Sequence, residues 1–185
     1  PFPDWNHRIA KECYRANAGA AILDEAGNVT ERVNNYDSLS FNFGPTLLSW
    51  MDGHAGELAR LLVQADKSSI ARCGHGTAMA QAYHHPILPL CSARDKETEV
   101  RWGVADFVHR FGRRPEGMWL PETAADLESL DVLAEQGMTF AVLAPRQAKA
   151  VRDIGGDWQD VDEHSVDPSR AYRVSLPSGR SIAVF

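Results

Sequence analysis

The sequence predicts an α/β fold, because helix and strand patterns alternate through residues 94–145. A short buried strand is predicted at GMWLP, residues 117–121, and a second at Phe140–Ala144, which is apolar throughout. A strand buried on both faces of a parallel sheet has this unbroken apolar character. The alternation favours parallel strands joined by right-handed crossovers, so an α/β barrel and an open α/β sheet both fit it.

Helices and loops are predicted for the first half of the chain. A helix is expected to start near Asp4, a favourable N-cap, and to run through residues 5–20. Residues 25–45 read as turn and loop, with a short strand near Ser40–Phe43, and Pro45 is expected to open the next helix. The following helix, over residues 55–72, has an apolar face at helical spacing, formed by Leu58, Leu61, Leu62 and Ala65.

The clearest predicted helix covers residues 92–112. Its apolar residues are spaced four, three and four apart: Val100, Val104, Phe107 and Phe111. Ser92 and Asp95 have the spacing of a capping box, and Gly112 is expected to be the C-cap.

The last predicted helix covers residues 123–137. Thr123 and Asp126 stand at capping-box spacing, and Gly137 is expected to end the helix. Residues 153–170 are polar and irregular, and residues 172–185 read as a hairpin that turns at Ser178–Gly179.

Composition narrows the classes of partner. The 185 residues are 44% apolar and 24% charged, and the net charge of −6 argues against a nucleic-acid or anionic-membrane partner. No apolar run approaches the roughly 20 residues of a membrane span, and no signal peptide is recognisable. Three widely spaced cysteines, Cys13, Cys73 and Cys91, favour reduced thiols in a cytoplasmic protein. No cofactor is predicted, and the sequence does not set the oligomeric state.

Glu122 follows directly after the predicted strand GMWLP. In α/β barrels the loops after the strands' C-terminal ends carry the chemistry. Pro121 ends the strand, and Trp119 is expected to share a strand face with Pro121. A carboxylate beside an indole suits carbohydrate chemistry, since the ring offers a platform for a sugar face and the carboxylate can attack an anomeric carbon or move a proton. The alternative is that Glu122 is a solvated residue in the first turn of the next helix, where the helix dipole favours it.

Several separated blocks, in order, resemble glycoside hydrolase family 57. The block EGMWLPETAADLESLDVLAEQG, residues 116–137, resembles the nucleophile region of that family. The blocks NNYDSLSFNFGPTLLSWM, GHGTAMAQAYHHPILPL and RDKETEVRWGVADFVHRFGRRPEG resemble the stretches that precede it in a bacterial subgroup, so the similarity covers roughly residues 2–152. The resemblance implies a (β/α)7 barrel, related to the TIM barrel, a retaining mechanism and α-glucan substrates, with Glu122 as the nucleophile.

The chain also departs from the family pattern. The family's histidine motif on the first strand is missing before Pro1, and nothing matches its acid/base aspartate. Of the local carboxylates, Glu116 precedes the strand and Asp126 reads as a helix cap, so the second carboxylate is expected beyond Phe185. The start without methionine and the apolar end SIAVF point the same way. Residues 1–185 are therefore expected to form part of a single catalytic barrel domain, truncated at both ends and inactive alone.

Three further residues are candidates for binding substrate hydroxyls. His75, within Gly-His-Gly, and His85, within His-His-Pro, are expected near Glu122, and Asn42 is placed at the rim. For each histidine a structural hydrogen bond is the main alternative, and metal ligation is a third, although their spacing matches no zinc pattern. For Asn42 the alternative is satisfaction of loop backbone. Trp50 and Trp102 fall on helix patterns and are interpreted as packing residues.

The leading hypothesis is a retaining glycoside hydrolase or 4-α-glucanotransferase that acts on an α-glucan or oligosaccharide. Which acceptor resolves the glycosyl-enzyme, water or a sugar hydroxyl, decides between hydrolase and transferase. A metal-dependent polysaccharide deacetylase is the second hypothesis, and it requires His75 and His85 with a carboxylate as ligands. A non-catalytic carbohydrate-binding barrel is the third.

Overall fold

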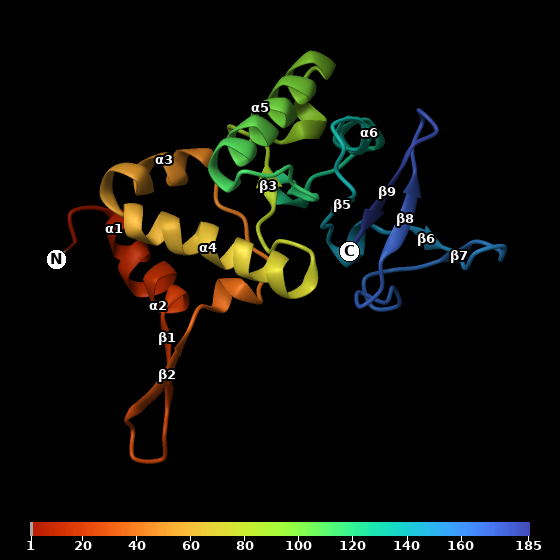
Figure 1. The fold of residues 1–185 in the computed structure, drawn as a ribbon. Coiled ribbons are helices and arrows are strands. Elements are labelled where there is room, and N and C mark those ends of the chain that lie inside the picture. Colours follow the sequence, from red (N-terminus) through yellow and green to blue (C-terminus); the bar gives the residue numbers. More distant parts are fainter. Residues whose placement is uncertain (1) are drawn as a thin grey trace. The chain divides into compact units, whose positions relative to one another are not determined.

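The computed structural model describes residues 2–185 and confirms an α/β fold (Figure 1). The chain groups into two compact units. The first unit contains the residues up to Ala80 together with Asp106–Arg114, and the second contains Gln81–Ala105 together with Pro115–Phe185.

The first unit begins with helical turns that run without a break from residue 5 to residue 18: α1 (Trp5–Ile9), the π-helix η1 (Ala10–Tyr14) and α2 (Arg15–Ala18). The predicted cap is confirmed, because the Asp4 carboxylate accepts a hydrogen bond from His7 N at 2.9 Å.

A hairpin follows where the sequence was read as turn and loop. Strands β1 (Ala20–Leu23) and β2 (Val29–Val33) pair antiparallel and extend away from the helices of this unit (Figure 1). The loop prediction was wrong for residues 29–33. Nearly all side chains of both strands are exposed, so the strands lack the alternation of apolar and polar residues that reveals a half-buried strand.

Two helices contribute much of the core of the first unit: α3 (Pro45–His54) and α4 (Gly56–Cys73), preceded by the 3₁₀ turn η2 (Asn35–Asp37). Pro45 stands in the first turn of α3, as predicted. Leu58, Leu62 and Ala65 are fully buried, whereas Leu61 is exposed and does not belong to the apolar face predicted for it. The strand predicted near Ser40–Phe43 is reduced to a single parallel bridge from Phe41 to Ala78.

The sheet of five strands has the order β3-β4-β5-β9-β8. Its strands are β3 (Ala80–Gln81), β4 (Gly117–Trp119), β5 (Phe140–Ala141), β8 (Tyr172–Ser175) and β9 (Ser181–Val184). β4 pairs parallel with β5, which confirms the pairing predicted from the helix–strand alternation, and β5 pairs parallel with β9. β8 and β9 form the predicted antiparallel hairpin, with Gly179 at φ 86° in its turn.

Two helices precede strands of this sheet in the sequence: the long α5 (Ala93–Phe111) comes before β4, and the shorter α6 (Leu127–Glu135) comes before β5. The Ser92–Asp95 cap is confirmed, since Asp95 N donates to Ser92 Oγ at 3.2 Å and Ser92 Oγ to Asp95 Oδ2 at 2.8 Å. For α6 the predicted box was wrong. Asp126 is itself the N-cap, accepting from Ser129 N, and Thr123 lies outside the helix.

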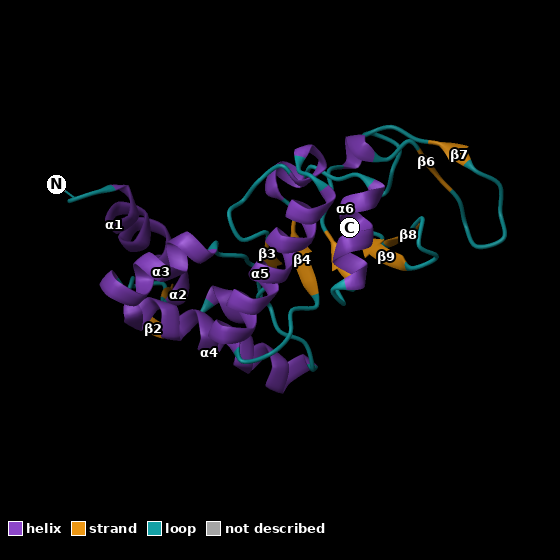
Figure 2. Ribbon diagram, turned by 90° about the horizontal axis from the view of Figure 1, so that it is seen from above, coloured by secondary structure: helices purple, strands orange, loops and turns teal. Residues whose placement is uncertain are grey.

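The remaining elements are short: η3 (Leu88–Leu90), η4 (Pro121–Thr123), η5 (Pro145–Gln147), β6 (Ala150–Val151) and β7 (Gln159–Asp160). Loops connect most of the chain between β5 and β8 (Figure 2). Residues 153–170 are irregular as predicted, except that Gln159–Asp160 form the short strand β7. Within residues 2–185, no helix has the length and apolar character needed to cross a membrane.

Candidate functional site

Glu122 lies where the chain passes from buried strand to open turn. Met118 and Leu120 are fully buried, and Pro121 is among the largest fully buried side chains. The Glu122 side chain, by contrast, is 78% exposed. The packing of β4 therefore ends at Pro121 and presents the next carboxylate to solvent, at the C-terminal end of a parallel strand.

The backbone around Glu122 is strained. Glu122 and Thr123 both have φ of 55°, in the left-handed region, and His85 has φ of 58°. These three are the residues other than glycine with positive φ within the described part of the chain. Such a conformation costs on the order of 1–3 kcal/mol for each residue and persists where the surrounding structure enforces it, often at functional sites.

His85 and Glu122 face each other within the second unit. His85 Nε2 lies 3.9 Å from Glu122 Oε1, and the histidine side chain is 45% exposed. The distance is too long for a direct hydrogen bond and leaves both groups accessible to a ligand. The structure thus brings together two of the residues that the sequence singled out, from segments 37 positions apart.

The strained turn is anchored on both sides. Thr123 N donates to Leu120 O at 2.9 Å, and Gln147 Nε2 donates to Thr123 O at 2.8 Å. Four residues after Glu122, Asp126 fixes the start of α6 by accepting from Ser129 N at 2.7 Å. The turn carrying Glu122 is therefore held by hydrogen bonds to Leu120 and Gln147, and it leads into a capped helix start.

A buried lysine adds a further anchor at the start of α6. Lys96, on α5, is 1% exposed and its Nζ donates to Asp126 Oδ2 at 3.0 Å and to Glu128 Oε2 at 2.5 Å. Desolvation acts to lower the pKa of Lys96, but the hydrogen bonds to Glu128 and Asp126 outweigh it and raise that pKa. Burial acts to raise the pKa of Asp126, but its hydrogen bonds with Ser129 and Lys96 bring it below the ordinary value.

The other local carboxylates have different places. Asp126 is a helix cap, as its place in the sequence predicted, and it also pairs with Lys96. Glu116 stands immediately before β4, whereas Glu122 stands after it. The backbone carbonyl oxygen of Glu116 accepts a hydrogen bond from Thr139 N at 2.7 Å. Trp119 is the last residue of β4 and is half-buried, three positions before Glu122.

His75 and Asn42 belong to the first unit. His75 is exposed directly after α4, which Gly74 ends in the left-handed conformation at φ 83°, and its carbonyl oxygen accepts from Ser69 Oγ at 2.8 Å. Asn42 is half-buried next to the bridging residue Phe41. The roles of both residues in substrate binding stay predictions.

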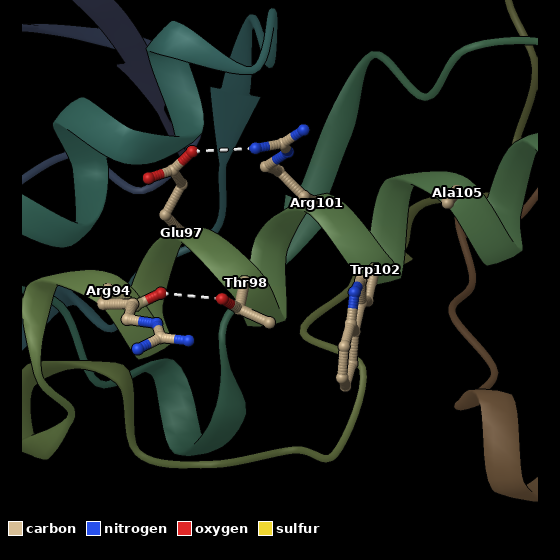
Figure 3. A pocket seen from close by; sticks show the side chains of 6 residues that line it. All are labelled: Arg94, Glu97, Thr98, Arg101, Trp102 and Ala105. Carbon is tan, nitrogen blue, oxygen red and sulfur yellow. Dashed lines mark hydrogen bonds and ion pairs between the residues drawn. The ribbon is translucent and has the colours of Figure 1, made fainter.

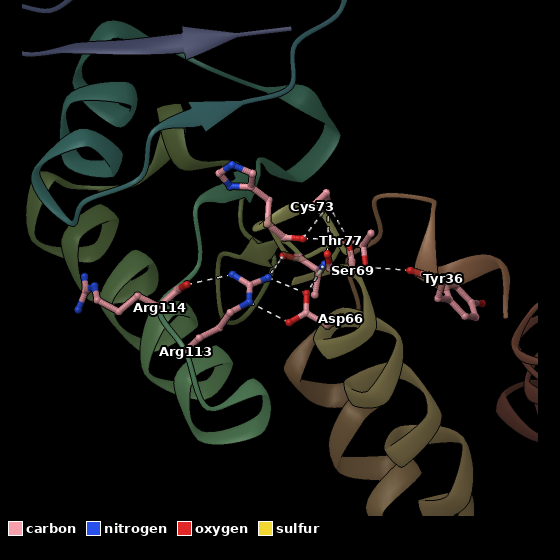
Figure 4. A network of polar contacts seen from close by, with 9 residues as sticks. Tyr36, Asp66, Ser69, Cys73, Thr77, Arg113 and Arg114 are labelled. Atoms are coloured by element: carbon pink, nitrogen blue, oxygen red, sulfur yellow. Dashed lines mark hydrogen bonds and ion pairs between the residues drawn. The ribbon is translucent and has the colours of Figure 1, made fainter. Parts of the chain in front are cut away.

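The segment that carries His75 is fixed by a buried ion pair (Figure 4). Asp66 is 1% exposed and accepts from Arg113 Nε at 2.8 Å and Nη2 at 2.7 Å. The same pair holds Ala78, whose N donates to Asp66 at 2.9 Å and whose O accepts from Arg113 at 3.0 Å. A Cβ on Gly76 would collide with both side chains and would force this ion pair to shift.

No group of three or more His, Cys, Asp and Glu side chains that could hold a metal ion is found among residues 2–185.

Two residues of this region were not picked out from the sequence. Lys96 gives little signal, because a lysine on a charged helix is normally solvated. Trp102 was interpreted as packing, but it is 51% exposed. The helical pattern held the necessary signal, since Trp102 lies roughly 200° around the helix from the buried Val100.

Comparison with known proteins identifies the family. The family model described as glycosyl hydrolase family 57 matches residues 5–185, so the chain belongs to this family. The resemblance noted in the sequence is thereby confirmed.

Known relatives and solved structures resemble this chain at low sequence identity. Alpha-amylase 1 of Dictyoglomus thermophilum is 26% identical over 106 residues, which are 57% of this chain and 15% of that protein. An exo-type maltose-forming amylase from Pyrococcus sp. ST04 has a TM-score of 0.65 at 17% identity, over 98% of this chain and 26% of its own. A 4-alpha-glucanotransferase from Thermococcus litoralis has a TM-score of 0.58 at 18% identity, over 81% of this chain and 22% of its own. The chain thus spans about a quarter or less of these proteins.

Proposed function

We propose that this chain carries the nucleophile of a retaining enzyme that acts on α-glucans, with Glu122 in that role. The observation that carries the proposal is the placement of Glu122: an exposed carboxylate in a strained turn at the C-terminal end of a buried parallel strand. Membership of glycosyl hydrolase family 57 supports the reaction class, and the names of the amylase and glucanotransferase relatives support the substrate.

The reaction runs in two displacements at one carbon. A Glu122 carboxylate oxygen attacks the anomeric carbon and forms an ester, while the glycosidic C–O bond breaks and its electron pair leaves with the oxygen. That oxygen takes a proton from a second carboxyl group. Water or a sugar hydroxyl, deprotonated by the same group, then displaces Glu122 and restores the original anomeric configuration.

The other candidate residues have binding roles in this scheme. His85, 3.9 Å from Glu122, is placed to hydrogen-bond a sugar hydroxyl in the space between them. Trp119 supplies apolar surface at the end of β4, and His75 and Asn42 bind further hydroxyls. The left-handed backbone at Glu122 aims its side chain out of the sheet toward the substrate, which is a use of strain for preorganisation.

The second carboxyl group is proposed to lie outside this chain. In a retaining enzyme it stands roughly 5–5.5 Å from the nucleophile. Asp126 is committed to Ser129 and Lys96, and Glu116 stands at the opposite end of β4 from Glu122. In this account residues 1–185 are one part of a (β/α)7 barrel, and the acid/base aspartate comes from beyond Phe185. The isolated chain is then inactive.

Deleting the proposed nucleophile and replacing it chemically tests the mechanism. In the full-length protein, Glu122→Ala should lower turnover of an activated α-glucosyl donor by about 10³-fold or more. Added azide should restore turnover and give the β-glucosyl azide, because azide attacks from the side that Glu122 occupied. The matched control is Glu116→Ala, which removes a carboxylate from the other end of β4 and should keep activity. Comparable losses in both variants, or no azide product, would count against Glu122.

A further inference from the structure

We propose that Trp102 is the platform of a second glucan-binding subsite, on the outer face of helix α5 and separate from the Glu122 turn. The inference rests on the proposed function in one respect, that α-glucans are the substrates. It assigns Trp102 to holding a long glucan chain and gives it no part in bond cleavage.

The indole is exposed on the side of α5 that faces away from its buried stripe. Val100 and Val104 are 0% and 6% exposed, whereas Trp102 between them is 51% exposed. Arg94, Thr98 and Trp102 recur at four-residue spacing and project from the same side of the helix (Figure 3). A large aromatic surface is therefore accessible on a rigid element.

Two rings hold the indole in place without covering it. The ring of Tyr83 contacts Trp102 edge-on at 5.8 Å between centroids, and that of His84 does so at 5.8 Å. The loop carrying both rings is tied to α5 at Glu99. His84 N and Nδ1 each lie 2.8 Å from a Glu99 carboxylate oxygen, and Tyr83 N donates to Glu99 O at 3.2 Å. The platform is preorganised, which lowers the entropic cost of binding.

A close backbone approach keeps this loop against the helix. A Cβ on Gly103 would collide with the carbonyl oxygen of Gln81, so only glycine permits the observed packing. Position 103 therefore has no side chain because the backbone of the Gln81 loop packs directly against it. This contact sets the distance between α5 and the loop that carries Tyr83 and His84.

Polar groups border the aromatic surface and suit a neutral ligand rich in hydroxyls. The shallow depression beside the indole is lined by Arg94, Glu97, Thr98, Arg101, Trp102 and Ala105 (Figure 3). Arg101 Nη1 lies 3.0 Å from Glu97 Oε1, and both side chains are at least half exposed. A sugar can place its apolar face on the indole and hydrogen-bond its hydroxyls to these groups. The mutual pairing of Arg101 and Glu97 favours an uncharged sugar over an anionic ligand.

The subsite is continuous in sequence with the proposed active site. His84 contacts Trp102, and the next residue, His85, faces Glu122. In this short segment the rings of Tyr83 and His84 contact Trp102, and the ring of His85 faces the Glu122 carboxylate. A glucan bound at Trp102 is held beside the segment that also contacts the reaction site.

Binding measured without turnover tests the subsite directly. The dissociation constant for maltoheptaose is measured in the full-length protein carrying Glu122→Gln, first with Trp102 intact and then with Trp102→Ala or Trp102→Phe added. We expect Trp102→Ala to weaken binding by about 3- to 10-fold and Trp102→Phe to recover most of it, because a smaller aromatic platform remains. The matched control is Trp158→Ala, which removes another exposed tryptophan of the second unit and should leave binding unchanged.

Oxidative footprinting of the same protein tests whether Trp102 is accessible to solvent and whether bound sugar covers it. Trp102 should be oxidised by hydroxyl radicals in the free protein and protected by maltoheptaose. Trp102 already protected without sugar would overturn the proposal, because another part of the protein would then cover it. Unchanged affinity in Trp102→Ala would overturn it too. Because the Glu122→Gln background needs no catalysis, sugar-dependent protection of Trp102 supports the subsite even if Glu122 proves not to be the nucleophile.

Discussion

His85 and Glu122 approach to 3.9 Å while both hold a left-handed backbone, at φ 58° and 55°. Two side chains from separate segments are thus presented to one space by conformations that their residue types disfavour. Thr123, also at φ 55°, extends the strain through the turn.

Relieving the strain at Thr123 should stabilise the protein and reduce activity. Thr123→Gly removes the Cβ and the branched side chain from a residue at φ 55°, which gains about 1 kcal/mol after the extra freedom of glycine in the unfolded chain is subtracted. Turnover should fall, because the turn no longer fixes Glu122. The control is Ala124→Gly, at φ −68°, which should destabilise by about 0.5–1 kcal/mol. Destabilisation by both substitutions in urea unfolding would refute the assignment of strain.

Removing the buried ammonium of Lys96 should loosen the start of α6. Lys96→Met fills a similar volume but leaves Asp126 and Glu128 without their cation, at a cost of about 1.5–3 kcal/mol in unfolding free energy. Arg101→Met is the matched control on the same helix. Its partner Glu97 is half exposed, so its loss should cost less than about 0.5 kcal/mol. Equal effects of the two substitutions would contradict the anchoring role of Lys96.

Breaking the ion pair beneath the His75 segment should be costly. Asp66→Asn leaves Arg113 without its buried carboxylate and should destabilise by about 3–5 kcal/mol. Asp52→Asn makes the same chemical change at an exposed partner of Arg110, which keeps Asp106, and should cost less than about 1 kcal/mol. Denaturant midpoints of the two variants, compared at constant slope, measure the difference. Similar midpoints would show that the buried Asp66–Arg113 pair stabilises the fold no more than the pair between Arg110 and the exposed Asp52 does.

Alkaline stability should depend on Tyr36. Burial raises the pKa of Tyr36 to about 12, from an ordinary value of about 10. The folded state therefore keeps a proton that the unfolded chain releases, so this contribution is complete below pH 10 and is lost as the pH rises toward 12. In Tyr36→Phe this part of the alkaline decline should be absent. Parallel stability–pH curves for both proteins between pH 9 and 12 would contradict it.

Local signals in the sequence predicted local structure well. The Ser92 cap, the Asp4 cap, the Pro45 helix start and the Gly179 turn depend on a few adjacent residues, and the structure shows each of them. The parallel pairing of β4 with β5 followed from the order of helices and strands.

Features that depend on three-dimensional context were missed. The β1–β2 hairpin buries little, so it leaves no periodic pattern. Thr123 matched a capping box by spacing, but the strained turn moves the cap to Asp126. The burial of Lys96 arises from α6, which lies 30 residues away in sequence and cannot be inferred from the α5 pattern. Trp102 is different: its angle around the helix marked it as exposed, and its aromatic character misled the interpretation.

The candidate site was predicted only in part. Sequence placed Glu122 at the end of a strand, and the structure shows it there, exposed and next to His85. The left-handed conformation of Glu122, Thr123 and His85 has no signature in the sequence, because it results from the surrounding packing and hydrogen bonds.

Trapping the glycosyl-enzyme in the full-length protein tests the central claim most directly. A fluorinated α-glucosyl donor with a good leaving group forms the ester quickly and releases it slowly, so the labelled residue can be mapped by peptide mass spectrometry. Our account predicts one label per active site, on Glu122, and none in Glu122→Gln. A label on a different residue, or glucan turnover by a protein whose Glu122 is never labelled, would contradict it.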